Sequence, residues 1–575
     1  MQASQKSSNG KTVSPVFVML KKVVDMLKTA PKGFWPVIVA VLCAGLIIFS
    51  AGITTIGPMD RDEARFAQAS KQMVMSGDYV TPRYQEELRA KKPAGIYWLQ
   101  SLSAASFGLD EISSYRIPSV IGGLITVTVT VLLAMLILPF QQAVFAGFFM
   151  ATALVVVVES HLAKSDSMLT AMIAIQQILL WKIRSLALAR QYVSGKYAIM
   201  FWAVMGFAIL IKGPIGPLVG FSTLVLLCLF DRSVMFARQL RWLRGLLIVL
   251  VIVAPWAVSV QIATQGAFLD IAIKADFLAK VQSAQESHGA PFGTYLLLLP
   301  LLAFPASFFA SQIAMLGRDV FKRDKGRFLI AWIIGYWLLI ELTPTKLPHY
   351  ILPILPALWL LVMMCFAYPA RPVKWRVRVS YAVIAISGLW GISFAFLLAW
   401  LALRYGGVGS GVAFMSSLVV ILLTAALLYG QWRWMTSPQS ALMAVILGVG
   451  AFLHLLTFSA VIANARYIHP STELAATIEQ FSVPTDMIAA AGYHEPSMVF
   501  LLSKDVLLVD ETEAALLLAE APAGLAIIEE RKKAVFLDVA QKIQLDVAEY
   551  GRVDGFNISK GQEITLLLYR RADLS

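Results

Sequence analysis

The chain has 575 residues, of which 58% are hydrophobic and only 14% charged, whereas soluble domains average about 25% charged residues. This composition excludes an ordinary soluble protein and makes lipid the expected solvent for most of the chain. The formal net charge of +13 does not indicate a nucleic-acid partner, because basic residues gather in alternate loops between apolar runs. This alternation is the positive-inside pattern of a multi-pass membrane protein.

The first 34 residues predict a cytoplasmic tail, since they are polar and rich in lysine. Within this tail, residues 16–30 form an amphipathic segment suited to the inner leaflet of a membrane.

Long apolar runs follow between residues 35 and 465, and they predict about thirteen membrane-spanning helices of roughly 20 residues each. An odd number of spans places the C-terminus on the side opposite the cytoplasm. The predicted spans are 35–55, 117–139, 142–158, 166–183, 197–211, 214–230, 242–262, 293–315, 327–342, 349–368, 379–403, 411–431 and 441–462.

The first outer loop, residues 56–116, carries a dense group of charges. Its "DRDE" has the spacing of a capping box, with Asp60 at the N-cap and Glu63 at the third position of a helix lying along the membrane surface. Asp62 and Arg65 are three residues apart and share one face of that helix. Two interpretations are open. Taken alone, the two residues are best explained as an ordinary ion pair; together with the other polar residues described below, they can present a carboxylate and a guanidinium to a substrate.

Three lysines stand just before a proline, a residue favoured at the first position of a helix. They are Lys92, Lys212 and Lys346. A helix N-terminus has free N–H groups and positive potential, so a lysine there makes an anion site. A single lysine at a membrane boundary is ordinary, but the predicted topology places all three on the outer side. We therefore expect them to hold a phosphate, with the hydroxyl of Tyr350 nearby; the alternative for Tyr350 is the aromatic belt of the membrane interface.

Asp166 adds a second carboxylate on the same side as Asp62, at the outer end of the fourth predicted span. Its alternative is a helix N-terminal role. A later outer loop contains Glu286 and His288, which have the types of side chain that bind metals. Two ligands are too few for a metal site, and a solvated loop explains them equally well. The sequence indicates no particular cofactor. Binding of a divalent metal ion is compatible with it, but no motif supports such binding.

Residues 466–575 change in character, because short apolar runs alternate there with helical segments. This pattern predicts a small α/β domain outside the membrane. The domain organisation expected from the sequence is thus a tail at 1–34, a membrane domain at 35–465 and an outer α/β domain at 466–575.

The conspicuous polar clusters all fall on one side of the membrane. A transporter would instead need ionisable groups within its spans, near the bilayer midplane. The distribution favours an enzyme that works at the outer surface on a phosphate-bearing lipid, with a lipid or sugar transporter as the alternative from another class.

Six motifs occur in order along the chain: "DRDEARFAQAS", "KKPAGIYWLQ", "KSDSMLTA", "IKGPIGPL", "QESHGAP" and "KLPHYILP". The ordered set resembles the GT-C glycosyltransferases that use polyprenyl-phosphate sugars, among them the ArnT-type aminoarabinose transferases and bacterial protein-mannosyltransferase-like enzymes. The resemblance implies a GT-C fold and active-site carboxylates at Asp62 and Asp166. It also implies contacts with the carrier phosphate or its sugar by Arg65, Lys92, Lys212 and Tyr350. The predicted phosphate contact of Lys346 is based on its position alone and not on the resemblance.

One departure from that family stands at Lys91-Lys92-Pro93, where the aminoarabinose transferases have Glu-Lys-Pro. The missing glutamate argues against a metal site that includes His288 and leaves the identity of the sugar open.

The resemblance implies inverting transfer of a sugar from a polyprenyl (undecaprenyl) phosphate to lipid A or lipopolysaccharide at the periplasmic face of the inner membrane. Lys92 and Lys212 would stabilise the leaving phosphate. Asp62 would act as the base toward a hydroxyl acceptor and would orient the substrate if the acceptor is itself a phosphate. A protein O-mannosyltransferase is the alternative within enzymes.

Overall fold

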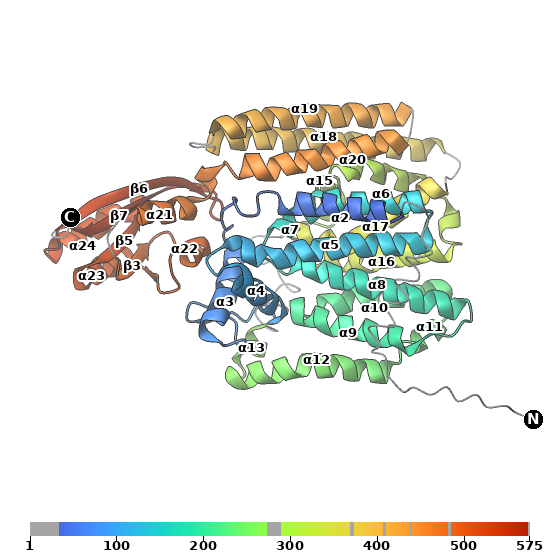
Figure 1. The fold of residues 1–575 in the computed structure, drawn as a ribbon, viewed down its shortest axis with the longest axis horizontal. Helices are drawn as coiled ribbons and strands as arrows, with labels where there is room; N and C mark the ends of the chain where they lie inside the picture. The colour runs from blue at the N-terminus through green and yellow to red at the C-terminus, as the bar shows by residue number, and fades with distance from the viewer. Residues whose placement is uncertain are drawn as a thin grey trace, which may run out of the picture.

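The computed structural model describes residues 34–272, 289–368, 373–405, 410–436, 440–480 and 485–572. The amphipathic segment predicted at 16–30 lies outside these residues. The molecule is a long helical bundle with a small α/β unit at one end, and most helices of the bundle run along its length (Figure 1).

The bundle is formed by helices that follow one another with short connections. Their bounds are α2 (Phe34–Ser50), α5 (Ile112–Ile137), α6 (Phe140–Thr152), α7 (Leu154–His161), α8 (Asp166–Leu188), α9 (Gly195–Lys212), α10 (Ile215–Asp231), α11 (Met235–Arg238), α12 (Trp242–Ala263), α13 (Ala267–Asp270), α15 (Thr294–Leu302), η2 (Ala306–Met315), η3 (Arg318–Val320), α16 (Asp324–Leu342), η4 (Pro348–Ile354), α17 (Leu355–Ala367), α18 (Lys374–Tyr405), α19 (Ser410–Thr436), α20 (Ser440–Leu456) and η6 (Thr457–Ile462).

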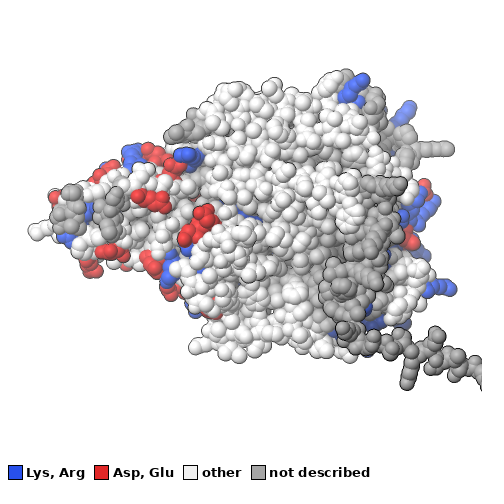
Figure 2. Space-filling view, viewed as in Figure 1, with Lys and Arg blue, Asp and Glu red and all other residues white. Residues whose placement is uncertain are grey.

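Seven helical segments among the described residues are long and apolar enough to cross a membrane, and the bent pair α6–α7 makes an eighth. Shorter apolar helices, such as α2 and α10, occupy other predicted spans. The chain is thus a multi-pass membrane protein, and the count of thirteen spans stays a prediction. Charged side chains gather at the two ends of the molecule and leave a wide band between them with few Lys, Arg, Asp or Glu side chains (Figure 2).

Two predicted spans are not single straight helices. The run at 142–158 is divided at Ala153, whose extended backbone separates α6 from α7 at an angle of 54°. The run at 293–315 is divided into α15 and the 3-10 helix η2, with Pro305 just before the second piece. Apolar runs without periodicity do not reveal such breaks, because every residue of the run is compatible with burial.

The segment between α2 and α5 forms a compact cap on one end of the bundle. It contains α3 (Asp62–Ser76), the strands β1 (Arg83–Tyr84) and β2 (Glu87–Leu88), and α4 (Gly95–Phe107). The cap is attached to the bundle by Arg116 of α5, which is buried and donates to both carboxylate oxygens of Glu63 at 2.9 and 2.8 Å. Arg116 also donates to backbone carbonyls of the preceding segment, including Ile56 at 2.7 Å.

The predicted capping box at the start of α3 is wrong. Arg61 is the N-cap residue and makes no side-chain cap hydrogen bond. Glu63 does accept the backbone N–H of Met59, but its carboxylate is mainly the partner of Arg116. Asp60 accepts the backbone N–H of Ser497 at 3.0 Å instead. Both partners are distant in sequence, so local spacing could not reveal them.

The C-terminal unit is a mixed five-stranded sheet in the order β4-β3-β5-β7-β6. The strands β3, β4 and β5 are parallel, and β7 pairs antiparallel with β5 and β6. The elements of this unit and of the chain leading to it are η7 (Arg466–Ile468), α21 (Pro470–Glu479), β3 (Met487–Ala491), α22 (Pro496–Leu501), β4 (Leu507–Val509), α23 (Glu511–Glu520), β5 (Gly524–Glu529), η8 (Glu530–Lys532), α24 (Lys533–Lys542), β6 (Val547–Asn557) and β7 (Gln562–Arg571).

Helices cover both faces of this sheet. Ala490 and Ile527 point into a core with α21 and α22, whereas their neighbours along the strands, such as Ala491 and Ile528, point into a second core with α23 and α24. Alternate residues of a strand face opposite sides of a sheet, so these two cores account for the apolar runs of the region. The unit has the α/β architecture that the sequence predicts.

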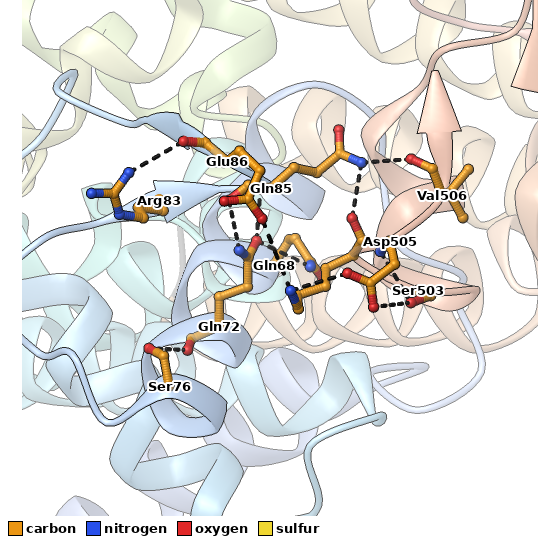
Figure 3. Close-up of polar contacts among 10 residues, drawn as sticks. Gln68, Gln72, Ser76, Arg83, Gln85, Glu86, Ser503, Asp505 and Val506 are labelled. Carbon is orange, nitrogen blue, oxygen red and sulfur yellow. Dashed lines mark hydrogen bonds and ion pairs between the residues drawn. The ribbon is translucent and has the colours of Figure 1, made fainter. Parts of the chain in front are cut away.

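The C-terminal unit is docked on the cap by side-chain contacts with backbone groups. Gln85, in the turn between β1 and β2, donates to the carbonyls of Lys504 and Val506 at 3.0 and 2.8 Å (Figure 3). Its own backbone is held by Gln72 of α3, which both donates to and accepts from Gln85. Lys71 donates to the carbonyl of Phe500 in α22 at 3.2 Å.

Asp60 makes this junction sensitive to pH. Burial, assisted by the nearby charge of Glu495, raises the pKa of Asp60 to about 6, although the hydrogen bonds from Ser497 favour the ionised form. Because the pKa in the folded state exceeds the ordinary value of 3.8, the folded state binds the proton more tightly than the unfolded state. The resulting stabilisation is complete below about pH 4 and is lost as the pH rises through about 6.

We therefore expect Asp60→Asn to flatten the pH dependence of stability in this window. The Tm of the wild-type protein should fall relative to that of the variant between pH 4 and pH 7. Thermal unfolding of both proteins in the same detergent measures this difference. A constant Tm difference across the window would contradict the assignment.

Candidate active site

The end of the bundle under the cap collects a group of charged side chains from distant parts of the chain. Two glycines allow this approach. A Cβ at Gly95 would lie 2.7 Å from the carbonyl oxygen of Leu210, so α4 packs directly on α9 near Lys212. A Cβ at Gly122 would lie 2.7 Å from the backbone nitrogen of Met168, so α5 packs directly on the first turn of α8. Small residues thus permit close contact between helix backbones.

The loop between α7 and α8 is held from two sides. Ser119 of α5 donates to the carbonyl of Leu162 at 2.7 Å, and Ser167 donates back to the carbonyl of Ser119 at 2.6 Å. The backbone N–H of Ala163 donates to Glu63 at 2.7 Å. These bonds fix the position of Asp166, the first residue of α8, where the free N–H groups and dipole of the helix favour a carboxylate.

Asp166 forms an ion pair with Lys212, the last residue of α9. Both side chains are almost fully buried in the protein. The Lys212 ammonium also lies 5.8 Å from the centre of the Tyr350 ring. The sequence placed these three residues together at one membrane face, and the structure brings them into one cluster.

Asp62 is the first residue of α3 and remains accessible to solvent, although protein surrounds it on several sides. Burial by these surroundings would raise the pKa of Asp62, but positive charges outweigh it and hold the pKa below its ordinary value. The charge of Lys164 has the largest of these lowering effects, followed by Arg89 and Lys92. Asp62 is therefore an ionised, accessible carboxylate within a positive environment.

A second buried ion pair supports this cluster. Lys164 donates to Glu159 of α7 at 2.8 Å, and both side chains are nearly inaccessible. His349 of η4 lies between the two pairs: its Nδ1 is 3.8 Å from Glu159, and its Nε2 is 3.6 Å from Asp166. These contacts connect Lys164, Glu159, His349, Asp166 and Lys212 in one continuous chain.

Other predicted site residues are placed differently. Burial raises the pKa of Asp60 and of Tyr84, and the nearby charge of Arg65 opposes this rise in part, so Arg65 lies toward the junction with the C-terminal unit. Lys346 donates to the carbonyls of Glu341 and Thr343 at 2.8 Å each, which are free because α16 ends there. Glu286 and His288 lie outside the described residues.

Four residues of the cluster were missed in the sequence, although each lies inside one of the six motifs or within five residues of one. They are Glu159, Lys164, His349 and Arg89. The sequence does show that each of them is a charged or imidazole side chain close to a predicted site residue. Their importance comes from pairing and burial, which depend on tertiary contacts that the sequence does not show. Among the described residues, no group of three or more His, Cys, Asp or Glu side chains is arranged to hold a metal ion.

Comparisons with known proteins give both sequence and fold relatives. Residues 91–258 match the family model of the dolichyl-phosphate-mannose-protein mannosyltransferases. The chain is 24% identical over 413 residues to the undecaprenyl phosphate-α-4-amino-4-deoxy-L-arabinose arabinosyl transferase of Erwinia tasmaniensis, over 68% of this chain and 66% of the relative. It is 25% identical over 377 residues to the transferase of the same name from Pseudomonas aeruginosa, over 63% of this chain and 65% of the relative. The chain thus spans slightly less than two thirds of the length of these curated relatives.

The fold relatives extend over more of the molecule. The crystal structure of ArnT from Cupriavidus metallidurans bound to undecaprenyl phosphate has a TM-score of 0.71 and 19% sequence identity, over 94% of this chain and 98% of that one. The apo structure of the same ArnT has a TM-score of 0.70. The chain therefore has the fold of ArnT and resembles, in motifs and in sequence, the membrane glycosyltransferases that use polyprenyl-phosphate-linked sugars.

Proposed function

We propose that this protein is an integral-membrane glycosyltransferase that moves a sugar from a polyprenyl-phosphate carrier to lipid A or lipopolysaccharide. The observation that carries the proposal is the cluster of Asp62, Asp166 and Lys212 at one end of a bundle with the ArnT fold. The relatives named above are undecaprenyl-phosphate arabinosyl transferases, and the matched ArnT structure has undecaprenyl phosphate bound.

The proposed reaction follows from the charges of the cluster. The sugar–phosphate bond breaks as the acceptor oxygen attacks the anomeric carbon, and the carrier leaves as a phosphate. Lys212 and Lys92 stabilise the charge that develops on this leaving group. Asp62 takes the proton of a hydroxyl acceptor, for which its ionised state suits it. A phosphate acceptor is already anionic and needs no base.

The proposed location is the inner membrane, with the tail in the cytoplasm and the cluster and C-terminal unit in the periplasm. The alternation of basic loops supports this orientation. Cysteine labelling at Asp78 and Ser503 should report the periplasm, and labelling at Gly195 the cytoplasm.

Two other functions are distinguished by specific observations. The family model matched by residues 91–258 favours a protein acceptor, as in a protein O-mannosyltransferase. A transporter is less well supported, because the buried ion pairs lie at helix ends: Lys212 ends α9, and Asp231, the partner of Arg184, ends α10.

Mass spectrometry of lipid A and core oligosaccharide from a deletion strain tests the proposal. Unchanged lipid A and core would count against it.

Lys212 and Lys346 give a matched pair of variants for the phosphate contact. Lys212→Ala should remove a charge-assisted contact of about 1.5–3 kcal/mol, which corresponds to a loss of roughly 10- to 150-fold in kcat/KM. Arginine at this position should rescue only in part, since its planar fork differs from a compact ammonium. Lys346→Ala should lower stability and leave kcat/KM of the folded protein near the wild-type value, because its ammonium caps α16. Steady-state transfer by purified variants measures both, and equal losses in the two would contradict the assignment.

A further inference from the structure

The pair Glu159–Lys164 is not explained by the mechanism proposed above. A buried ion pair costs more in desolvation than it returns unless its geometry and surroundings compensate. Here the lysine makes a 2.8 Å contact with Glu159, and His349 extends the contact to Asp166. The pair therefore stands beside the reacting groups and is joined to them by polar contacts.

The backbone around Lys164 is held as firmly as its side chain. Its carbonyl accepts from Ser119 at 3.2 Å, and its N–H donates to the carbonyl of Leu162 at 2.7 Å. The preceding residue, Ala163, is bonded to Glu63, which Arg116 holds in turn. A lysine side chain has many rotamers and normally remains mobile, but both ends of this one are fixed.

We propose that Lys164 is a positioning residue of the site, whose ammonium is clamped by Glu159 and supplies a fixed positive charge to Asp62 and Asp166. The proposal rests on the transferase function proposed above. It divides the cations of the cluster into two kinds. The side chains of Lys164 and Lys212 are equally exposed, at 11%, so their partners distinguish them. Lys92 and Lys212 are the groups proposed to meet the donor phosphate, whereas Lys164 is held by Glu159 and serves the carboxylates.

The charge balance explains why such a residue is needed. Asp62, Glu159 and Asp166 bring three carboxylates together, and a phosphate bound to Lys212 would share the positive charge that now faces Asp166. Lys164 is then the buried cation that stays. The groups facing Asp62 are Lys164, Arg89, Lys92 and His349. The groups facing Asp166 are His349, Lys212, Lys164, Glu159 and Tyr336.

The test is the pH profile of kcat/KM for wild type, Lys164→Gln and Lys164→Arg. An opposite charge near an aspartate lowers its pKa by about 1–3 units, so Lys164→Gln should raise the proton affinity of the site carboxylates about tenfold or more. We expect wild-type kcat/KM to stay flat down to the lowest pH at which the protein remains folded. Lys164→Gln should lose activity within that range, and Lys164→Arg should restore most of the wild-type profile.

Lys325 provides the matched control. Its ammonium donates to the carbonyl of Ile137 at 2.7 Å, at the end of α5 that lies about 37 Å along the helix from the cap. Lys325→Gln should leave the acid side of the profile unchanged. A merely structural Lys164 would behave like Lys325, with less folded protein and an unmoved profile, and that result would overturn the proposal.

Two additions keep the test decisive. If Lys164→Gln fails to fold, the double variant Glu159→Gln with Lys164→Met removes the pair without leaving a buried unpaired charge. It should show an upward movement of smaller size, because the negative charge of Glu159 is lost together with the ammonium, and an unmoved profile would overturn the proposal. If the wild-type protein transfers no sugar, the proposed function fails, but Lys164 can still be assessed. The infrared carboxyl signal that Asp62→Asn abolishes should then titrate at higher pH in Lys164→Gln than in wild type; an equal midpoint would refute the role of Lys164.

Discussion

Replacement of Asp62 by asparagine is expected to lower kcat/KM by about 10²- to 10⁴-fold when the acceptor is a hydroxyl, the range for loss of a general base. The reason is that Asp62 is an accessible carboxylate that nearby cations keep ionised. Asparagine keeps the size of the side chain but cannot accept the proton. Transfer kinetics with purified protein and a defined donor measure the loss.

The same variant separates the two classes of acceptor. With a phosphate acceptor, Asp62 only orients the substrate, so the loss should be near the roughly 10- to 150-fold expected for one hydrogen bond to a charged group. Asp60→Asn is the control two residues away, because Asp60 contacts Ser497 at the junction and should affect stability more than turnover. Wild-type kinetics in Asp62→Asn would remove this residue from the mechanism.

Replacement of Arg116 by methionine is expected to lower the free energy of unfolding by about 3–5 kcal/mol, the cost of leaving a buried charge without its partner. Arg116 joins α5, the segment before α3 and Glu63 in one buried network. Chemical denaturation in mixed micelles measures the change.

The double variant Arg116→Met with Glu63→Gln should recover part of the lost stability, because it no longer buries an unpaired carboxylate. Lys322→Gln, which removes an exposed ion pair with Asp319, should produce no measurable change. If Arg116→Met proved as mild as Lys322→Gln, the network would not be what attaches the cap to the bundle.

Composition and apolar runs predicted the larger features of the fold well, because lipid imposes strong constraints on spanning segments. The alternating pattern after residue 466 predicted an α/β unit, and the two cores on either side of the sheet agree with it. The break at Ala153 was not predictable, since nearly all residues around it are apolar and neither Gly nor Pro stands next to it.

The candidate site was predicted where local sequence fixes the position of a side chain. Asp166 begins α8 and Lys212 ends α9, so their helices alone bring them to the same end of the bundle. The structure pairs Lys346 with the end of α16. Its ammonium donates to the carbonyls of Glu341 and Thr343, which have no helical partner because α16 ends there. Lysine before proline is equally compatible with both outcomes.

Partners across long sequence distances were beyond prediction. Glu63 meets Arg116, and Asp60 meets Ser497, where a capping box had been expected. Glu159 and Lys164 are close in sequence, but their significance comes from His349, which arrives from another part of the bundle. Burial and pairing of these groups follow from the packing of α5, α7 and α8, and no single stretch of sequence encodes it.

The most direct test of the proposed function is sugar transfer by the purified protein in proteoliposomes that contain a polyprenyl-phosphate-linked sugar and lipid A. The measured quantity is the release of polyprenyl phosphate together with the mass added to the acceptor. The proposal predicts turnover by the wild-type protein and a strong reduction in Asp62→Asn and Lys212→Ala. Release of carrier phosphate at the same rate by wild type and both variants, or no turnover with any lipopolysaccharide acceptor, would contradict it.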